Sequence, residues 1–313
     1  MIFTKPFKEL SKNDVSLAGG KGASLGELTK AGIPVPDGFV ILSTAFEKFI
    51  KDNDLNVEID SALHSVRHNE MESVEEASEK IQALIVSTEI SKVLKKEILK
   101  EFRKLKSKFV AVRSSATAED SEIAAWAGQL DTFLNTTEKN LLENVQKCWA
   151  SLFTPRAIFY RFEKKLHERK ISVAVAVQKM VQSEVSGVAF SVHPVTQDRN
   201  QLIIEAAFGL GEAIVSGQIT PDSYVVEKKG FLMLDKNINE QEKGIFRKQS
   251  RGNEWKKIPA EKARRQKLSD KEIIELAKLV VKIEKHYGFP VDVEWVREKG
   301  KFFITQSRPI TTL

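Results

Sequence analysis

Four polar residues in the last part of the sequence could bind a metal ion and a phosphate group together. Asp292 and Glu294 lie two apart on one predicted strand, and Gln306 and Arg308 lie two apart on the next. Residues two apart share one face of a strand, and a turn at 298–300 places Glu294 within about one residue of Gln306. Mg²⁺ shared with a nucleotide prefers oxygen ligands and keeps several waters, while a guanidinium binds phosphate oxygens. The pattern therefore indicates a Mg²⁺ site beside a phosphate clamp.

The alternative interpretation of this hairpin is a solvent-exposed polar face, which is common at the edge of a sheet. Val291, Val293 and Trp295 alternate with the acidic residues and are expected to bury the opposite face. That alternation fixes the direction in which the polar residues point. The residues alone support the two interpretations about equally.

A glycine-rich loop near the start of the sequence could bind an anion. Gly19, Gly20, Lys21 and Gly22 come just before a predicted helix at 22–31. Glycines let backbone N–H groups approach an anion, the helix N-terminus carries positive partial charge, and the lysine adds a full charge. The loop matches neither the P-loop pattern nor the dinucleotide fingerprint. An ordinary glycine turn with an exposed lysine is the alternative.

Arg113 ends a predicted buried strand, and its planar side chain suits phosphate oxygens. The polar loop that follows also carries Glu119 and Asp120, so a structural ion pair is the alternative. Further along, Gly128 and Thr132 supply flexible backbone and a hydroxyl group. Each of these signals is weak when it is taken alone.

The segment from Gln178 through Lys179 and Met180 to Val181 follows an apolar strand at 173–177. The end of such a strand could offer backbone N–H and C=O groups to the edge of an adenine ring. Composition alone would not indicate this role.

The composition is that of an ordinary folded protein. The 313 residues are 42% hydrophobic and 29% charged, and 49 basic against 43 acidic residues give a net charge of +6. These values exclude a disordered tail, a collagen-like repeat and a small disulfide scaffold. The basic clusters at 164–170 and 256–267 lack interleaved aromatic residues, so nucleic acid is not an expected partner.

Cys148 is the only cysteine, so the chain cannot form an internal disulfide or a cysteine-based zinc site. A reducing cytoplasm is the expected compartment. The first residues lack the pattern of a secretory signal, and no apolar run approaches the ~18 residues that span a bilayer. Neither membrane association nor secretion is expected.

The order of the predicted elements indicates the α+β class in two lobes. A capping box formed by Ser269 and Glu272 begins a helix that ends near Tyr287. The segment 235–267 is strongly charged and is expected to be an exposed excursion. The remaining elements are a helix at 44–52, helices within 58–106, helices within 138–169 broken at Pro155, strands between 172 and 228, and a hairpin over 291–307.

Taken in order, these segments resemble one family, the N-terminal nucleotide-binding domain of phosphoenolpyruvate synthase (pyruvate, water dikinase). Pyruvate, phosphate dikinase and rifampin phosphotransferase share this domain. The matching segments span nearly the whole chain: GGKGASLGEL (19–28), GIPVPDGFV (32–40), VRSSATAED (112–120), AGQLDTFLN (127–135), QKMV (178–181), SGVAFSVHPVT (186–196), EAAFGLGEAIVSGQITPDSY (205–224), DVEW (292–295) and TQSRP (305–309). One such motif is weak, but the ordered set is highly specific.

The resemblance implies an ATP-grasp-like fold that holds ATP between two lobes. One lobe, 1–180, would contain the glycine-rich loop and the adenine-side strand, and the other, 181–313, would contain the metal-binding hairpin. The implied catalytic residues, which contact the polyphosphate, are Lys21, Arg113 and Arg308. The other implied contacts are Gly128 and Thr132 in a loop over the phosphates, Gln178, Lys179, Met180 and Val181 against adenine, and Glu294 and Gln306 with ATP and Mg²⁺, assisted by Asp292.

In this family the terminal diphosphate unit of ATP passes to a histidine on a separate domain, and pyruvate becomes phosphoenolpyruvate. None of the five histidines in this sequence lies in the glycine- and threonine-rich setting of the family's phosphate carrier. The expectation is therefore a nucleotide-binding half that works with a phosphohistidine domain, either in a missing part of the chain or in a partner. The alternatives are the corresponding domain of a rifampin phosphotransferase and a non-catalytic nucleotide sensor.

Overall fold

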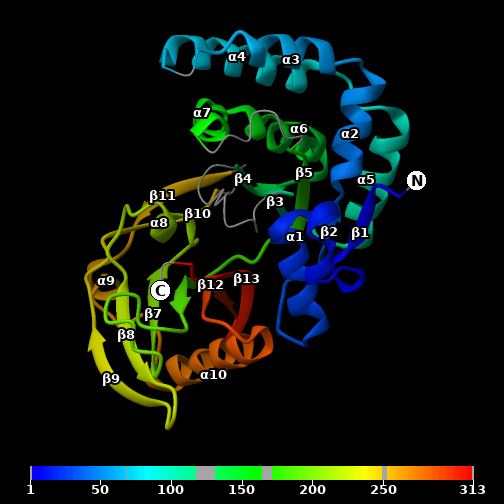
Figure 1. The fold of residues 1–313 in the computed structure, drawn as a ribbon. Helices are drawn as coiled ribbons and strands as arrows, with labels where there is room; N and C mark the ends of the chain where they lie inside the picture. Colours follow the sequence, from blue (N-terminus) through cyan, green and yellow to red (C-terminus); the bar gives the residue numbers. More distant parts are fainter. Residues whose placement is uncertain (1, 68, 118–130, 164–170, 249–251, 312–313) are drawn as a thin grey trace. The chain divides into compact units, whose positions relative to one another are not determined.

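A computed structural model gives the fold and describes residues 2–67, 69–117, 131–163, 171–248 and 252–311. The chain contains both helices and strands, and they occur in runs of one type, such as the four helices between residues 43 and 104 and the four strands between residues 222 and 257 (Figure 1); this agrees with the predicted α+β class. The chain divides into two compact units. The first unit contains Met1–Glu27 and Asp37–Met180, and the second contains Leu28–Pro36 and Val181–Leu313.

The first unit is built on a five-stranded sheet with the order β1-β2-β5-β3-β4. Its strands are β1 (Thr4–Pro6), β2 (Gly38–Ile41), β3 (Val110–Ala116), β4 (Thr132–Thr136) and β5 (Val173–Lys179). Its helices are α1 (Val15–Lys30), α2 (Ser43–Asp52), α3 (Asn56–His64), α4 (Met71–Ser87), α5 (Lys92–Lys104), α6 (Leu141–Ala150) and α7 (Pro155–Glu163). The last turn of α1 belongs to the second unit.

One face of this sheet forms the core of the first unit. Alternate residues of β3 and β5, among them Val112 and Val175, are fully buried against α2 to α6. In Figure 1, α3 and α4 form an outer layer over α6 and α7. The break predicted at Pro155 is confirmed, because this residue begins α7 and proline suits the first position of a helix.

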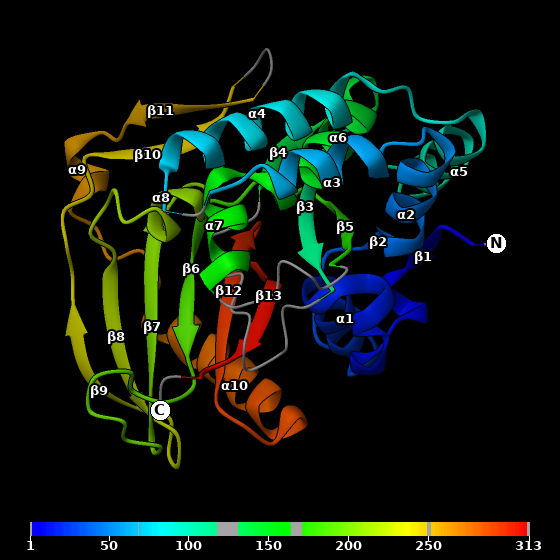
Figure 2. The same cartoon turned by 45° about the horizontal axis from the view of Figure 1, so that its top comes forward.

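The second unit is built on a six-stranded antiparallel sheet with the order β13-β12-β6-β7-β8-β9, several strands of which run side by side in Figure 2. Its strands are β6 (Val185–Phe190), β7 (Gln201–Phe208), β8 (Asp222–Glu227), β9 (Leu232–Asn237), β12 (Val291–Glu298) and β13 (Lys301–Pro309). A separate hairpin consists of β10 (Lys243–Arg247) and β11 (Asn253–Lys257), and the helices are α8 (Glu212–Val215), α9 (Ala260–Ala263) and α10 (Asp270–Tyr287).

Helix α10 covers one face of this sheet and forms the core with it. Ile273, Leu276 and Val280 have no exposed surface and pack with β-strand residues such as Val293. The predicted capping box is confirmed, since the Ser269 side chain accepts from the Glu272 N–H and the Glu272 side chain accepts from the Ser269 N–H. Asp292 and Glu294 alternate with the core residues of β12 and point to the other face of the sheet.

One local expectation is confirmed in part and another is wrong. Most described residues of the segment 235–267 are exposed, as predicted, but the segment also forms the β10–β11 hairpin and ends at Lys267, whose side chain has no exposed surface. The turn of the terminal hairpin is also shorter than predicted. It consists of Lys299 and Gly300, both with positive φ (49° and 75°), which is the backbone of a tight two-residue turn.

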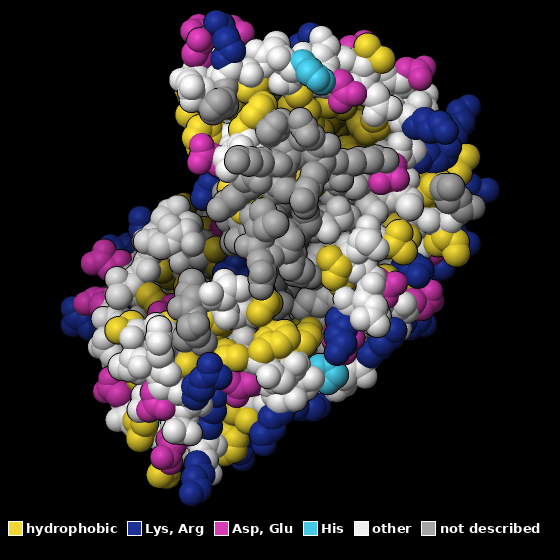
Figure 3. All heavy atoms as spheres, viewed as in Figure 1, with side chains coloured by type: hydrophobic (Ala, Val, Ile, Leu, Met, Phe, Trp, Pro, Cys, Tyr) yellow, Lys and Arg dark blue, Asp and Glu magenta, His cyan; other side chains and the backbone are white. Residues whose placement is uncertain are grey.

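Charges of both signs are interspersed on the face drawn in Figure 3, and no wide basic area appears among the residues coloured there. No helix in the part of the chain that the structure describes is long and apolar enough to cross a membrane.

Candidate functional site

The terminal hairpin pairs the four polar residues singled out from the sequence. Glu294 lies directly opposite Gln306, and Asp292 lies directly opposite Arg308. The predicted register is therefore confirmed. The Arg308 Nε donates a hydrogen bond to the Asp292 Oδ2 at 2.7 Å. One carboxylate of the row is thus already held by a cation.

A β-bulge places the second half of this row. The register between β12 and β13 shifts between Glu294 and Trp295, which leaves Thr305 as the extra residue on β13. Ile304 packs in the core, and without the bulge Gln306 would point the same way, because residues two apart share a face. The extra residue turns Gln306 to the face that carries Glu294. The bulge therefore assembles the pair.

A third carboxylate, not predicted from the sequence, lies on the same face. Glu205 of β7 lies opposite Val188 of β6, which in turn lies opposite Glu294, so these residues form one row across the sheet. The available signal was a lone acidic residue in the otherwise apolar run of β7. Its place beside the hairpin depends on pairings between distant segments, which the sequence alone did not reveal.

The carboxylates of this face stand in an environment that disfavours negative charge. Burial raises the pKa of Asp292, the neighbouring Glu294 charge raises it further, and the Arg308 guanidinium opposes both effects. Burial also raises the pKa of Glu205, with a further contribution from the Asp292 charge. A cation bound at this face would relieve the repulsion between these groups.

The donors at this face suit Mg²⁺. Glu294 and Gln306 offer a carboxylate and an amide oxygen from directly paired positions, and Mg²⁺ commonly takes one or two protein ligands together with waters and phosphates. Among the described residues, no group of three or more His, Cys, Asp or Glu side chains is arranged to hold a metal ion. The chemistry of the donor set therefore fits a metal ion that is shared with a ligand.

The glycine-rich loop lies in the first unit, and its backbone requires glycine. Helix α1 begins earlier than predicted and is interrupted at Gly19, where φ is 66° and ψ is 170°. A Cβ atom there would lie 2.2 Å from the Ser115 Oγ, so no other residue fits without displacing β3. The Ser115 Oγ donates to the Ala18 carbonyl at 3.0 Å and accepts from the Gly22 N–H at 3.2 Å. This serine therefore holds both ends of the loop.

The same contacts bring the predicted phosphate-binding cations together. The Lys21 Nζ donates to the Ser114 carbonyl at 3.1 Å, next to Arg113 on β3. Arg113 is 8% exposed and lies directly opposite Thr132 of β4. Cross-strand partners project to the same face of a sheet. Lys21, Arg113 and Thr132 therefore form one group, while Gly128 lies outside the described residues.

The predicted adenine strand has a more specific arrangement than its sequence suggested. Gln178 is 2% exposed and lies opposite Ala111, which shares a sheet face with Arg113. The Lys179 N–H donates to the Asp37 carbonyl at 2.7 Å, and the Met180 N–H donates to the Phe109 carbonyl at 3.1 Å. These two amide groups are therefore engaged within the protein, while the next residue, Val181, belongs to the second unit.

The charged end of Lys179 is also engaged, because its Nζ lies 2.8 Å from the Asp37 Oδ2. The predicted site residues thus form two groups. Lys21, Arg113, Thr132, Gln178, Lys179 and Met180 lie in the first unit, and Val181, Asp292, Glu294, Gln306 and Arg308 lie in the second.

Comparison with known proteins identifies one family. The model of the pyruvate phosphate dikinase AMP/ATP-binding domain matches residues 15–313. A probable phosphoenolpyruvate synthase of Methanocaldococcus jannaschii is 46% identical over 100% of this chain and 27% of its own length. The phosphoenolpyruvate synthase of Pyrococcus furiosus is 40% identical over 99% of this chain and 44% of its own length.

A rifampicin phosphotransferase of Bacillus subtilis is also similar, with 39% identity over 97% of this chain and 35% of its own length. The chain therefore spans less than half the length of these curated relatives.

Proposed function

The chain belongs to the pyruvate phosphate dikinase AMP/ATP-binding domain family, and from this premise we propose that it binds Mg-ATP as the phosphotransferase half of a phosphoenolpyruvate synthase. In this proposal its two units, 1–180 and 181–313 apart from the exchanged segment 28–36, are the lobes of an ATP-grasp-like fold. The relatives named phosphoenolpyruvate synthase support the assignment.

The observation that carries the proposal is the pairing of Glu294 with Gln306 and of Asp292 with Arg308 on the face opposite the core. Glu294 and Gln306 would hold Mg²⁺, with assistance from Asp292. Arg308 would bind a phosphate oxygen through its planar guanidinium. When bound, Mg²⁺ supplies charge neutralisation for the phosphates. Glu205 adds a further carboxylate near these residues.

The first unit would supply the cations for the polyphosphate. Lys21 stands on a loop whose backbone is fixed by Gly19 and Ser115, so its ammonium group is held near Arg113. Phosphoryl transfer depends mostly on positioning and on the stabilisation of charge, and these two residues can provide both. Thr132 and Gly128 would belong to the segment that covers the phosphates.

The arrangement of the adenine strand restricts how it could bind the base. Because the Lys179 and Met180 N–H groups already donate within the protein, these two groups would not bind adenine, while a backbone carbonyl oxygen of this segment would accept from its amino group. Gln178 and Val181 would border the ring.

The acceptor of the diphosphate unit would be a histidine on a phosphohistidine domain, supplied by the rest of a longer protein or by a partner. AMP would remain after transfer. Water would then cleave the diphosphate on the histidine and release one phosphate ion, and the phosphoryl group left on the histidine would pass to pyruvate. The cytoplasm is the proposed location, because ATP and pyruvate are both available there. A rifampicin phosphotransferase is the second candidate, and the relative from Bacillus subtilis favours it specifically. The acceptor that takes phosphate from the carrier histidine distinguishes the two.

Isothermal titration of Mg-ATP into the chain and its variants tests the binding proposal. We expect Glu294→Gln and Lys21→Ala each to lower the affinity by about tenfold or more, because each removes a charge from the phosphate–metal group. Matched controls are Glu298→Gln on the same strand and Lys30→Ala on the same helix, which should bind like the wild type. Equal affinity in all five proteins would reject the assigned site.

A further inference from the structure

The terminal strand β13 has one edge that the sheet leaves largely unpaired. It is an outer strand, so only its other edge pairs with β12. The Ile304 N–H points outward and donates to the Pro34 carbonyl at 2.8 Å. In an antiparallel strand the outward N–H and C=O groups recur every second residue. The backbone of Phe302, which lies in the same unbroken register, therefore also points outward.

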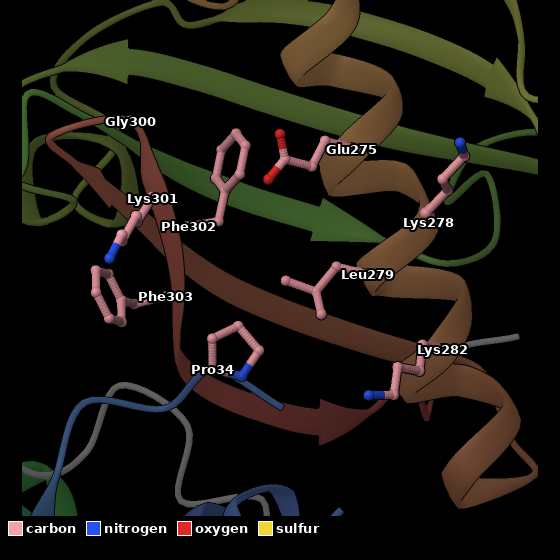
Figure 4. A pocket seen from close by; sticks show the side chains of 9 residues that line it. All are labelled: Pro34, Glu275, Lys278, Leu279, Lys282, Gly300, Lys301, Phe302 and Phe303. Carbon is pink, nitrogen blue, oxygen red and sulfur yellow. The ribbon is translucent and has the colours of Figure 1, made fainter. Parts of the chain in front are cut away.

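A groove of about 500 Å³ runs along this edge. Figure 4 shows that Leu279 and Lys282 of α10 border one side of it, while Lys301 and Phe303 of β13 border the other. Pro34 lies at one end, where its carbonyl accepts from the outward Ile304 N–H. The groove thus combines apolar walls with a strand edge.

The charges around the groove are mostly positive. Lys278, Lys282 and Lys301 line it and are exposed, against one acidic residue, Glu275. The Lys282 Nζ donates to the Gly32 carbonyl at 3.2 Å, which directs it toward the β13 edge. The Lys278 Nζ lies 5.6 Å from the centre of the Phe231 ring, so it borders the groove less directly. The complementary ligand is therefore anionic.

We propose that this groove binds an extended, acidic peptide segment of a partner protein, which adds as a short strand beside residues 301–303. Main-chain hydrogen bonds to Phe302 would set the position of the peptide. Its side chains would alternate between Leu279 with Lys282 on one side and Lys301 with Phe303 on the other. The preferred sequence therefore alternates acidic and apolar residues. The groove uses none of the residues assigned to Mg-ATP, so it is independent of the nucleotide proposal.

Fluorescence anisotropy with a labelled, amidated EVEVEV peptide tests the proposal on the full chain. The double variant Lys282→Glu with Lys301→Glu should weaken binding by about tenfold, because it replaces two attractions with two repulsions at exposed positions. The control is Lys271→Glu with Lys285→Glu, which makes the same charge change on α10 outside the groove. Equal weakening in both double variants, or no binding by the wild type, would overturn the proposal.

Amide hydrogen exchange separates strand addition from charge attraction. The bound peptide should slow exchange of the Phe302 amide. Two further peptides carry N-methyl groups at alternate residues, one at the odd and one at the even positions. The peptide whose methylated nitrogens face β13 should bind more weakly than the other. Unchanged exchange at Phe302 would overturn the proposal. Self-association of the chain that the groove variant abolishes, without peptide binding, would assign the groove to a second copy and would overturn it as well.

Discussion

Two acid–base pairs lie on opposite faces of the six-stranded sheet, and their surroundings differ. Asp222 of β8 points to the core face, where its Oδ1 lies 2.8 Å from the Lys267 Nζ, and neither side chain has any exposed surface. The Asp222 carboxylate also accepts from the Tyr224 hydroxyl at 2.7 Å and from the N–H groups of Asn239 and Lys267, each at 3.0 Å. Every charge in this pair is met by a fixed partner.

Asp292 and Arg308 form the contrasting pair on the open face. They are joined at 2.7 Å, with side chains that are 12% and 48% exposed. Asp292 stands close enough to Glu205 and Glu294 for their charges to interact, as the raised pKa values of Asp292 and Glu205 indicate. The core pair is complete within the protein, whereas the open pair leaves negative charge and a partly exposed guanidinium. We therefore expect the core pair to stabilise the fold and the open pair to contact a ligand.

Removal of the core cation should have the largest effect on stability. Lys267→Met leaves the Asp222 charge buried without its partner, so we expect the free energy of unfolding to fall by about 3–5 kcal/mol. Urea denaturation followed by circular dichroism measures it. Tyr224→Phe serves as a milder variant if the first does not fold, and should cost about 1–3 kcal/mol because it removes one hydrogen bond from the buried carboxylate. A change below about 1 kcal/mol in both variants would contradict the comparison.

Removal of the open cation should affect binding more than folding. Arg308→Met should change the free energy of unfolding by at most about 1 kcal/mol, because the pair is partly exposed. The same variant should weaken Mg-ATP binding by about tenfold or more, since it removes a charge-assisted phosphate contact.

Arg308→Lys distinguishes a phosphate contact through the planar guanidinium from the effect of a positive charge alone. Because a lysine cannot reproduce the planar pair of donors, it should restore only part of the affinity for Mg-ATP. Titration calorimetry and urea denaturation on the same samples measure both quantities. A large loss of stability with unchanged binding would reverse the assignment of the two pairs.

The sequence predicted the open face much better than the core pair. Strict alternation of valine and tryptophan with acidic residues fixed which side of β12 is polar, so Asp292 and Glu294 could be assigned from local spacing. Lys267 follows a charged segment, and nothing near it in the sequence indicates burial. Its partner Asp222 lies 45 residues earlier, and only the folded chain brings them together.

The same limit explains the other differences between sequence and structure. Glu205 reaches the hairpin through two strand pairings between distant segments, and Gly19 is explained only by Ser115, far along the chain. The bulge at Glu294 has no glycine or proline to mark it. The alternation of residues along a strand thus predicted which side chains share a face. Features that depend on contacts between residues far apart in the sequence were not predicted.

The smallest expected effect concerns the pH dependence of stability. The pKa values of Glu205 and Asp292 are raised in the folded chain. At a pH between the ordinary and the raised pKa values, the folded state therefore binds more protons than the unfolded state. The free energy of unfolding therefore falls as the pH rises through that window, which starts at the ordinary carboxyl pKa of about 4. This contribution of the open face is fully lost above the raised values.

Glu205→Gln removes one of these titrating groups without changing the size of the side chain. We expect it to make the decline with pH shallower and to raise the free energy of unfolding at neutral pH by a few tenths of a kcal/mol, since it removes a repulsion between neighbouring carboxylates. Glu227→Gln at the end of β8 is the matched control, and urea denaturation over a series of pH values is the measurement. A decline as steep as in the wild type would mean that neither burial nor the Asp292 charge raises the pKa of Glu205 in the folded chain. Glu205 would then not contribute to the difference between the open face and the core pair.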